Sequence, residues 1–260
     1  MTRTERLARI LAILEEHKAS TVPELAGELD VSHMTVRRDL VSLVDDERVK
    51  ILHGSVILHP KSDSRSVDSY YSLIAAGSLH RKQKRAIGAL AASLVEPDDA
   101  LIIDSGSTTG YLAKELPSDR PYSALSYSLN VLSETVRRKN CRTLFAGGVF
   151  HDNTLMFEGP EALDMIRRYR ASKAFISSAG LSAQFGVTCM NPYERETKLA
   201  VMQSSLRKIL LVDSSKFGVV RSEWFANLSD FDELVTDSSL GDDDETIIRG
   251  MGIRLHIARV

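Results

Sequence analysis

The feature of this sequence that most constrains its fold is the alternation of strand-like and helix-like segments from residue 81 to residue 260. Short apolar runs, such as 100–104, 123–127 and 174–178, are each followed by a longer segment with helical periodicity. Strands that alternate with helices form a mainly parallel sheet, which helices cover on both faces. Further strand-like runs are 143–146, 209–212, 234–236 and 253–257. The sequence therefore predicts a large α/β domain over residues 81–260.

The first 60 residues have another pattern, that of short capped helices. Thr2 and Thr21 are each followed three residues later by a glutamate, which is the spacing of a helix capping box. Ser32 begins a third segment with helical apolar spacing, shortly after the second helix is expected to end at Asp30. Two helices joined so closely must cross steeply, as they do in a helix-turn-helix.

Two apolar runs, 49–52 and 55–58, follow the third helix and flank His53-Gly54, which predicts a two-stranded wing. The residues after the wing are rich in Ser, Asp, Lys and Arg, the composition of a linker. We therefore expect a winged helix-turn-helix in residues 1–60, a linker in residues 61–80 and the α/β domain after it.

The third predicted helix has a cationic face. Its apolar residues fall on one side and leave Arg37 and Arg38 exposed. In a major groove, such guanidinium groups reach guanine or phosphate oxygens. The bulk charge does not support DNA binding, because the net charge is -2 and residues 1–60 hold eight Lys and Arg against ten Asp and Glu. Adjacent arginines are also a common solvated surface, so the prediction rests on where the charges lie.

Hydroxyl residues and glycines follow the strand that ends at Asp104. Glycines let a backbone approach a ligand closely, and the unpaired N–H groups at a helix start can donate to phosphate oxygens. The hydroxyls that could join them belong to Ser105, Ser107, Thr108 and Thr109. The lysine of a Walker A loop is missing. The same residues also fit a plain capped turn in which Asp104 holds backbone amides.

A second segment of this kind, 213–218, follows the strand-like run 209–212. Ligands of open α/β sheets bind beyond the carboxyl ends of strands, so the ammonium of Lys216 could neutralise the same phosphate. A lysine after a strand is also often merely solvated. The two segments together favour a binding site for a phosphorylated molecule.

Several protein classes are not expected. Charged residues interrupt the first turns of the chain, which argues against a signal peptide. No run approaches the roughly 18 apolar residues of a membrane span. Cys141 and Cys189 lie far apart without a CxxC partner, which argues against a disulfide framework or a metal site. We expect a cytoplasmic protein without a cofactor.

The run Val31-Ser32-His33-Met34-Thr35-Val36-Arg37-Arg38-Asp39-Leu40 resembles the pattern V-S-x-x-T-I/V-R-R-D-L of the DeoR family of bacterial transcription repressors. That resemblance implies binding to operator DNA as a homo-oligomer and release by a phosphorylated sugar. In the wing the family often has R-x-H-G-G where this chain has Ile51-Leu52-His53-Gly54-Ser55, so a wing contact is less well supported. The DNA-contacting positions that we infer are Ser32, His33, Thr35, Arg37, Arg38 and His53.

The resemblance extends into the larger domain, through Lys84, Gly147-Gly148 and Lys173-Ala174-Phe175-Ile176. Many members have T-N-S or T-N-N after the second sensor strand, whereas this chain has Tyr127-Ser128-Leu129-Asn130. That departure resembles one branch of the family and implies deoxyribose 5-phosphate as inducer and deoxyribonucleoside catabolic genes as targets. The inferred effector-binding positions are Asp104, Ser105, Gly106, Ser107, Thr108, Thr109, Tyr127, Ser128, Gly147, Gly148 and Lys216.

Two alternatives remain at this point: a repressor that responds to a different sugar phosphate, and an enzyme. The larger domain resembles the fold of ribose 5-phosphate isomerases and CoA transferases, in which Asp104, Asp213 and Lys216 could do acid–base work. Such isomerases have an acidic cluster after the middle strand, where this chain has Gly180-Leu181-Ser182-Ala183-Gln184-Phe185-Gly186. A binding protein is therefore favoured over an enzyme.

Overall fold

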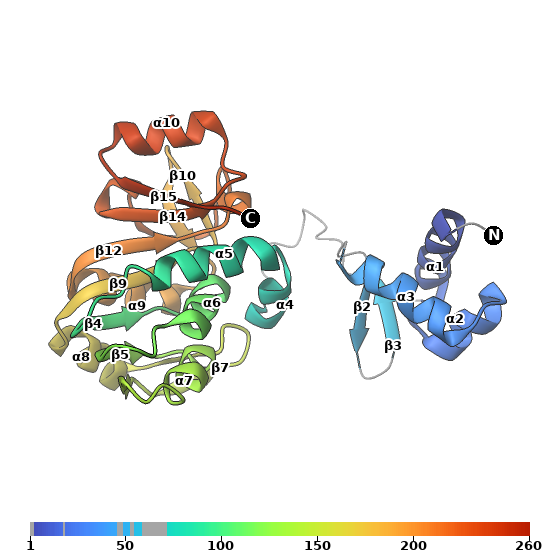
Figure 1. Cartoon of the computed structure of the whole chain (residues 1–260), viewed down its shortest axis with the longest axis horizontal. Helices are drawn as coiled ribbons and strands as arrows, with labels where there is room; N and C mark the ends of the chain where they lie inside the picture. Colours follow the sequence, from blue (N-terminus) through green and yellow to red (C-terminus); the bar gives the residue numbers. More distant parts are fainter. Residues whose placement is uncertain (1–2, 18, 46–48, 53–54, 59–71) are drawn as a thin grey trace. The chain divides into compact units, whose positions relative to one another are not determined.

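The computed structural model describes residues 3–17, 19–45, 49–52, 55–58 and 72–260. The chain divides into two compact units, Met1–Ser69 and Tyr70–Val260 (Figure 1). The helix α4 (Leu73–Ser78) belongs to the second unit, although it lies in the stretch 61–80 that the sequence predicts as linker. With six residues, α4 is too short to show helical periodicity in the sequence.

The described residues of the first unit form three helices and a small antiparallel sheet. The helices are α1 (Arg3–His17), α2 (Val22–Leu29) and α3 (His33–Asp45). The strands β1 (Ala19–Thr21), β2 (Val49–Leu52) and β3 (Ser55–Leu58) pair in the order β1-β3-β2. Apolar side chains from all three helices and from the wing strands form one core, which includes Leu14, Leu25, Leu40, Val49 and Val56. The predicted helices and wing are confirmed, and His53 lies outside the described residues.

Local capping explains where the helices of this unit begin. The Thr21 hydroxyl accepts a hydrogen bond from the Glu24 backbone N–H, and the Glu24 carboxylate accepts one from the Thr21 backbone N–H. Ser32 Oγ accepts from the Thr35 backbone N–H at 3.1 Å and so caps α3. Between the two helices Asp30 adopts a left-handed conformation, with φ at 51°, which reverses the chain in a tight turn.

The second unit is built on a parallel seven-stranded sheet with the order β15-β14-β12-β9-β4-β5-β6. Its strands are β4 (Ala100–Ile103), β5 (Tyr122–Ser126), β6 (Cys141–Phe145), β9 (Ala171–Ser177), β12 (Ser205–Leu211), β14 (Glu233–Asp237) and β15 (Arg254–Ala258). The order reverses between β4 and β9. In open α/β sheets, ligands bind at the carboxyl ends of the strands at such a reversal.

Helices cover both faces of this sheet (Figure 1). One core contains residues of α5 (Arg81–Ala92), α6 (Ser107–Glu115) and α7 (Leu129–Thr135). The other contains residues of α8 (Pro160–Arg168), α9 (Pro192–Gln203) and α10 (Asp242–Gly250). Alternate residues of β4 belong to opposite cores, Leu101 and Ile103 to the first and Ile102 to the second. The predicted α/β fold with a mainly parallel sheet is confirmed.

Short elements that the sequence analysis did not predict complete the unit. The hairpin of β7 (Val149–His151) and β8 (Met156–Glu158) is antiparallel, as is a sheet of β10 (Gly180–Ser182), β11 (Gly186–Cys189) and β13 (Glu223–Ala226). Two 3-10 helices are η1 (Ser214–Lys216) and η2 (Leu228–Asp230). In the described part of the chain, no helix has the length and apolar character that a membrane crossing requires.

Candidate functional site

The exposed face of α3 is cationic and apolar. Arg37 and Arg38 are exposed, and Met34 and Val41 beside them are 65% and 60% exposed. His33 is also exposed, at the first position of the helix. The opposite face buries Val36, Leu40 and Leu43 in the core of the unit. The structure thus brings the predicted arginines together on one solvent-facing surface.

Ser32 and Thr35 lie at the start of α3, where their hydroxyl oxygens are 2.9 Å apart. Ser32 Oγ also caps the N-terminal end of α3. The residue is exposed, so the same side chain both caps the helix and faces solvent. Asp39 points the other way, with a side chain only 2% exposed, and its carboxylate pairs with Arg6 Nε of α1 at 2.5 Å. The sequence analysis assigned no role to this ion pair.

In the second unit, three adjacent strands end in polar groups. Asp104 follows β4, Ser177 ends β9, and Asp213 follows β12 just beyond Leu211. The three strands are neighbours in the order β12-β9-β4, so their carboxyl ends share one edge of the sheet. This edge includes the point at which the strand order reverses.

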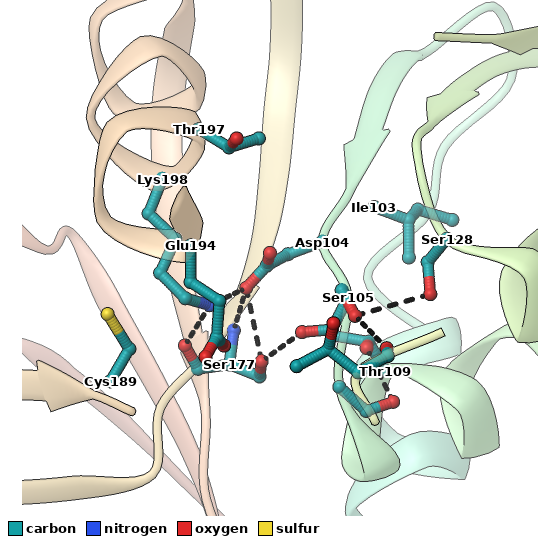
Figure 2. A network of polar contacts seen from close by, with 12 residues as sticks. Ile103, Asp104, Ser105, Thr109, Ser128, Ser177, Cys189, Glu194, Thr197 and Lys198 are labelled. Atoms are coloured by element: carbon teal, nitrogen blue, oxygen red, sulfur yellow. Dashed lines mark hydrogen bonds and ion pairs between the residues drawn. The ribbon is translucent and has the colours of Figure 1, made fainter. Parts of the chain in front are cut away.

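The Asp104 carboxylate is the centre of a buried network (Figure 2). Its Oδ2 accepts from the Ser177 backbone N–H at 2.9 Å, lies 3.1 Å from the Ser177 hydroxyl, and accepts from Lys198 Nζ. Its Oδ1 accepts from the Tyr127 hydroxyl. Asp104 is 1% exposed and Tyr127 is fully buried. Asp104 and Tyr127, both predicted effector-binding positions, are therefore turned toward each other inside the protein.

Lys198 of α9 is the buried cation of this network, and the sequence analysis did not assign it a role. Besides Asp104, it donates to the Ser177 carbonyl at 3.0 Å. Burial lowers the pKa of Lys198, but the charges of Asp104 and Glu194 raise it more, and the net pKa is above the ordinary value of 10.5. The raised pKa favours the charged ammonium at neutral pH. The sequence does contain one signal, because Glu194 and Lys198 are one helical turn apart on the buried face of α9.

The segment 105–109 wraps over this network. Gly106 packs against Ser177 so closely that a Cβ at residue 106 would lie 2.4 Å from Ser177 Oγ. Thr109 Oγ1 donates to the Gly106 carbonyl at 3.1 Å, and both Thr108 and Thr109 are buried. Of residues 105–109, only Ser107 is partly exposed, and it is the first residue of α6.

Ser105 and Ser128 bind protein groups beneath the loop. Ser105 Oγ donates to the Thr154 carbonyl at 2.8 Å, and Ser128 Oγ lies 3.3 Å from Ser105 Oγ. Thr154 belongs to the connection between β7 and β8, so the hairpin is attached to the loop through these serines. Gly148 stands at the base of the hairpin, where a Cβ would lie 2.2 Å from the Glu158 carbonyl oxygen, whereas Gly147 is exposed and has open space around it.

Lys84 of α5 is also buried at this edge of the sheet. Its Nζ donates to the Ala76 and Leu79 carbonyls at 2.5 and 2.9 Å, and it lies 3.8 Å from Asp213 Oδ2. Asp213 Oδ2 is buried and accepts no hydrogen bond from the described residues. Lys216 lies close by in η1 and is partly exposed. Among the described residues, no group of three His, Cys, Asp or Glu side chains could hold a metal ion.

Comparison with known proteins gives matches over both units. The family model described as "DeoR-like helix-turn-helix domain" matches residues 6–61, and the model described as "DeoR C terminal sensor domain" matches residues 79–238. The deoxyribose operon repressor of Escherichia coli (strain K12) is 34% identical over 235 residues, 90% of this chain and 90% of that protein. The HTH-type transcriptional regulator GolR of Listeria innocua is 30% identical over 236 residues, 91% of each chain.

Among solved structures, ribose 5-phosphate isomerase A from Methanocaldococcus jannaschii aligns over 53% of this chain and 54% of that chain, with a TM-score of 0.39 and 14% identity. The sequence relatives are named repressors and transcriptional regulators, and the first unit has the helix-turn-helix of a DNA-binding protein, so the chain is a transcription regulator and not an enzyme. Because both family models match in order along the chain and the relatives align over nine-tenths of it, this protein belongs to the DeoR family.

Proposed function

We propose that this protein represses genes of sugar or deoxyribonucleoside catabolism and leaves its operator when a phosphorylated sugar binds at the carboxyl ends of β4, β9 and β12. The observation that carries the proposal is a set of buried polar atoms at that edge. Within the described residues, Ser178 Oγ after β9 makes no hydrogen bond, and Asp213 Oδ2 after β12 accepts none, although Lys84 Nζ lies 3.8 Å from it. Buried polar groups normally have partners, so these atoms favour a polar ligand.

The start of α6 supports a phosphate as one part of this ligand. The first N–H groups of a helix have no intrahelical partner, and the helix dipole favours an anion there. Gly106 lets this backbone lie close to β9, and Ser107 adds a hydroxyl on the exposed side. Lys216, which is partly exposed, adds a cation at the end of β12. The hydroxyls of a sugar would then donate to Asp213, which is an acceptor only.

Lys84 is proposed to couple ligand binding at this site to the DNA-binding unit. Its ammonium holds two carbonyls near the end of α4, and α4 is the first helix after the segment that leads from the helix-turn-helix. A sugar hydroxyl that binds Asp213 changes the surroundings of that ammonium, which lies 3.8 Å from Asp213 Oδ2, and so changes the hold on α4. A coupling of about 1–3 kcal/mol between the two sites is typical of such regulators.

On the DNA side, the exposed surface of α3 is proposed as the recognition helix. Arg37 and Arg38 contact base edges or phosphates, and Ser32, His33 and Thr35 lie at the end of α3 that enters the groove first. His53 of the wing is proposed as an additional contact, although it lies outside the described residues. Helix-turn-helix proteins read paired half-sites as dimers, so we expect a homo-oligomer and a palindromic operator.

Deoxyribose 5-phosphate is the proposed inducer. It is supported by the name of the Escherichia coli relative, a deoxyribose operon repressor, and by the family resemblance of 127–130. The alternative is another sugar phosphate bound at the same place. A thermal-shift panel tests the choice: deoxyribose 5-phosphate should raise the unfolding midpoint more than ribose 5-phosphate, glucose 6-phosphate or inorganic phosphate, and unphosphorylated deoxyribose should have no effect. A response to none of the phosphates would overturn the effector proposal.

A further inference from the structure

The position of Asp104 poses an electrostatic problem for a phosphate site. Its carboxylate stands three residues before the first residue of α6, whose N–H groups attract anions. An uncompensated carboxylate so near would repel a phosphate, and burial would strengthen that repulsion because the local dielectric is low. A phosphate can bind at the start of α6 only if the charge of Asp104 is cancelled.

Lys198 cancels it from the opposite face of the sheet. Lys198 lies on α9, whereas the loop that it supports leads into α6, and the two helices pack in different cores. Its Nζ contacts the Asp104 carboxylate and the Ser177 carbonyl and lies 5.4 Å from the centre of the Phe225 ring, with 2% of the side chain exposed. Figure 2 shows the ammonium and the carboxylate pointing at each other across the end of β9.

The donors around Asp104 argue against a direct role in ligand binding. One carboxylate oxygen faces three donor groups from Ser177 and Lys198, and the other faces the Tyr127 hydroxyl. The Ser177 backbone N–H and the Lys198 ammonium occupy one oxygen and the Tyr127 hydroxyl donates to the other, so both carboxylate oxygens have protein partners. Asp104 therefore holds β9, α9 and the end of β5 together beneath Gly106, and it does so without meeting solvent.

We infer that Lys198 and Asp104 form a positioning pair for the effector site, in which Lys198 neutralises the carboxylate so that an anion can bind at the start of α6. This inference rests on the proposed function. It assigns Asp104 and Tyr127 to the support of the site, and it leaves Ser107 and the N–H groups of α6 to contact the ligand. It also gives a function to a lysine whose side chain is buried inside the protein.

The test is the affinity for deoxyribose 5-phosphate, measured by calorimetry on the full chain at several pH values, with wild type titrated at each pH. In Lys198→Met, Asp104 keeps its charge without a counter-ion, and affinity falls about tenfold or more at pH 8. If the loss comes from the charge of Asp104, removing that charge as well should return affinity toward wild type, whereas a purely structural loss would not be regained.

The groups that face Asp104 and Lys198 include other titratable side chains: Glu194 on α9, Cys189 on β11 and Tyr127 after β5. Cys189 and Tyr127 have pKa values raised by burial and stay neutral over this range, whereas the raised pKa of Glu194 can bring it into the range. The double variant Asp104→Asn/Lys198→Met separates these contributions. This variant removes both charges of the pair, so the affinity for deoxyribose 5-phosphate is restored at pH 8. Any dependence of that affinity on pH that remains is assigned to Glu194.

Lys139→Met is the matched control, because it removes one exposed lysine from the connection before β6, at the opposite edge of the sheet. It should bind as wild type does. If Lys198→Met and the double variant are equally weak at every pH, or if both bind as wild type, the pair is not a charge-neutralising device and the inference is overturned. Should Lys198→Met not fold, the double variant decides, since it must bind as wild type. Absence of binding to wild type itself overturns the proposed function, and the inference with it.

Discussion

Arg6 and Asp39 join the first helix to the third through a charged contact that is almost closed to solvent. The Asp39 carboxylate is 2.5 Å from Arg6 Nε, and the two side chains are 2% and 14% exposed. Asp39 directly follows the exposed arginines of α3, but it points into the unit. The pair therefore fixes the rotation of α3, and with it the direction of Arg37 and Arg38.

Asp39→Asn is expected to weaken the protein's preference for its operator several-fold, because α3 loses its charged attachment to α1. Non-specific DNA affinity depends mainly on phosphate contacts and should change little. The measurement is the ratio of affinities for a selected duplex and a random duplex. Arg9→Gln is the control, since Arg9 is an exposed arginine on α1, the helix that carries Arg6. An equal loss on both duplexes would show that Asp39 does not orient the reading surface.

Arg37→Ala and Arg38→Ala are each expected to reduce operator discrimination by about 1–3 kcal/mol if the side chain reads a base. If a side chain contacts only phosphate, its removal should instead weaken all duplexes alike and lower the salt dependence of binding. Gel-shift titrations at several salt concentrations distinguish the two roles. Unchanged affinity and salt dependence in both variants would exclude α3 as the recognition helix.

Lys216→Ala should leave operator binding intact and abolish release by the sugar phosphate, because it removes a cation from the effector site and none from the first unit. Lys84→Ala should also prevent release, and in addition it should lower the unfolding midpoint, because its ammonium holds two carbonyls of the α4 region. Induction is read as loss of the DNA complex on ligand addition. A Lys216→Ala protein that is released normally would remove Lys216 from the site.

Gly106→Ala is predicted to destabilise the second unit by about 1–3 kcal/mol, since the added Cβ would lie 2.4 Å from Ser177 Oγ and would push the loop away from β9. Gly250→Ala is the control, because it has open space around it at the end of α10. Denaturant unfolding measures both. A neutral Gly106→Ala would mean that the loop can shift at no cost, and the close packing on Ser177 would then not define the site.

The burial of Glu194 is expected to make the free energy of unfolding depend on pH. Burial raises its pKa above the ordinary value of 4.5, so the folded state binds a proton more tightly than the unfolded state does. The stability contributed by the protonated form is therefore present at low pH and is lost as pH rises through the folded pKa. Glu194→Gln keeps the capping oxygen near Asn191 and removes the charge. Its stability relative to wild type should increase with pH above 4.5, and a constant difference would contradict this assignment.

The sequence predicts the repeating elements of this fold well, because long periodic segments report on burial directly. The strand predicted at 100–104 is observed at Ala100–Ile103, and the serine expected to cap the third helix does so. The hairpin β7–β8 and the sheet of β10, β11 and β13 were missed. Their strands are three or four residues long, and their pairing is set by tertiary contacts, such as that between Gly148 and the Glu158 carbonyl, which no local pattern reveals.

The candidate site was predictable in its location and less so in the roles of its residues. The hydroxyl-rich segment after Asp104 does lie at the reversal of the strand order. Sequence gives no reason, however, to place Asp104 and Tyr127 inside the protein, since both could equally face a ligand. Lys198 was missed because a lysine within an amphipathic helix is normally exposed. Its spacing from Glu194 and its position on the same face as Val201 are the signals that point to burial.

The most direct test of the account is whether a sugar phosphate bound in the second unit controls DNA binding by the first. Purified full-length protein is used to select a duplex from a random library, and a gel-shift titration then follows that complex as deoxyribose 5-phosphate is added. We expect selection of a palindromic duplex and its release by the sugar phosphate, with no release by unphosphorylated deoxyribose. Failure to prefer any duplex over random DNA, or a selected complex that no sugar phosphate releases, would contradict the account.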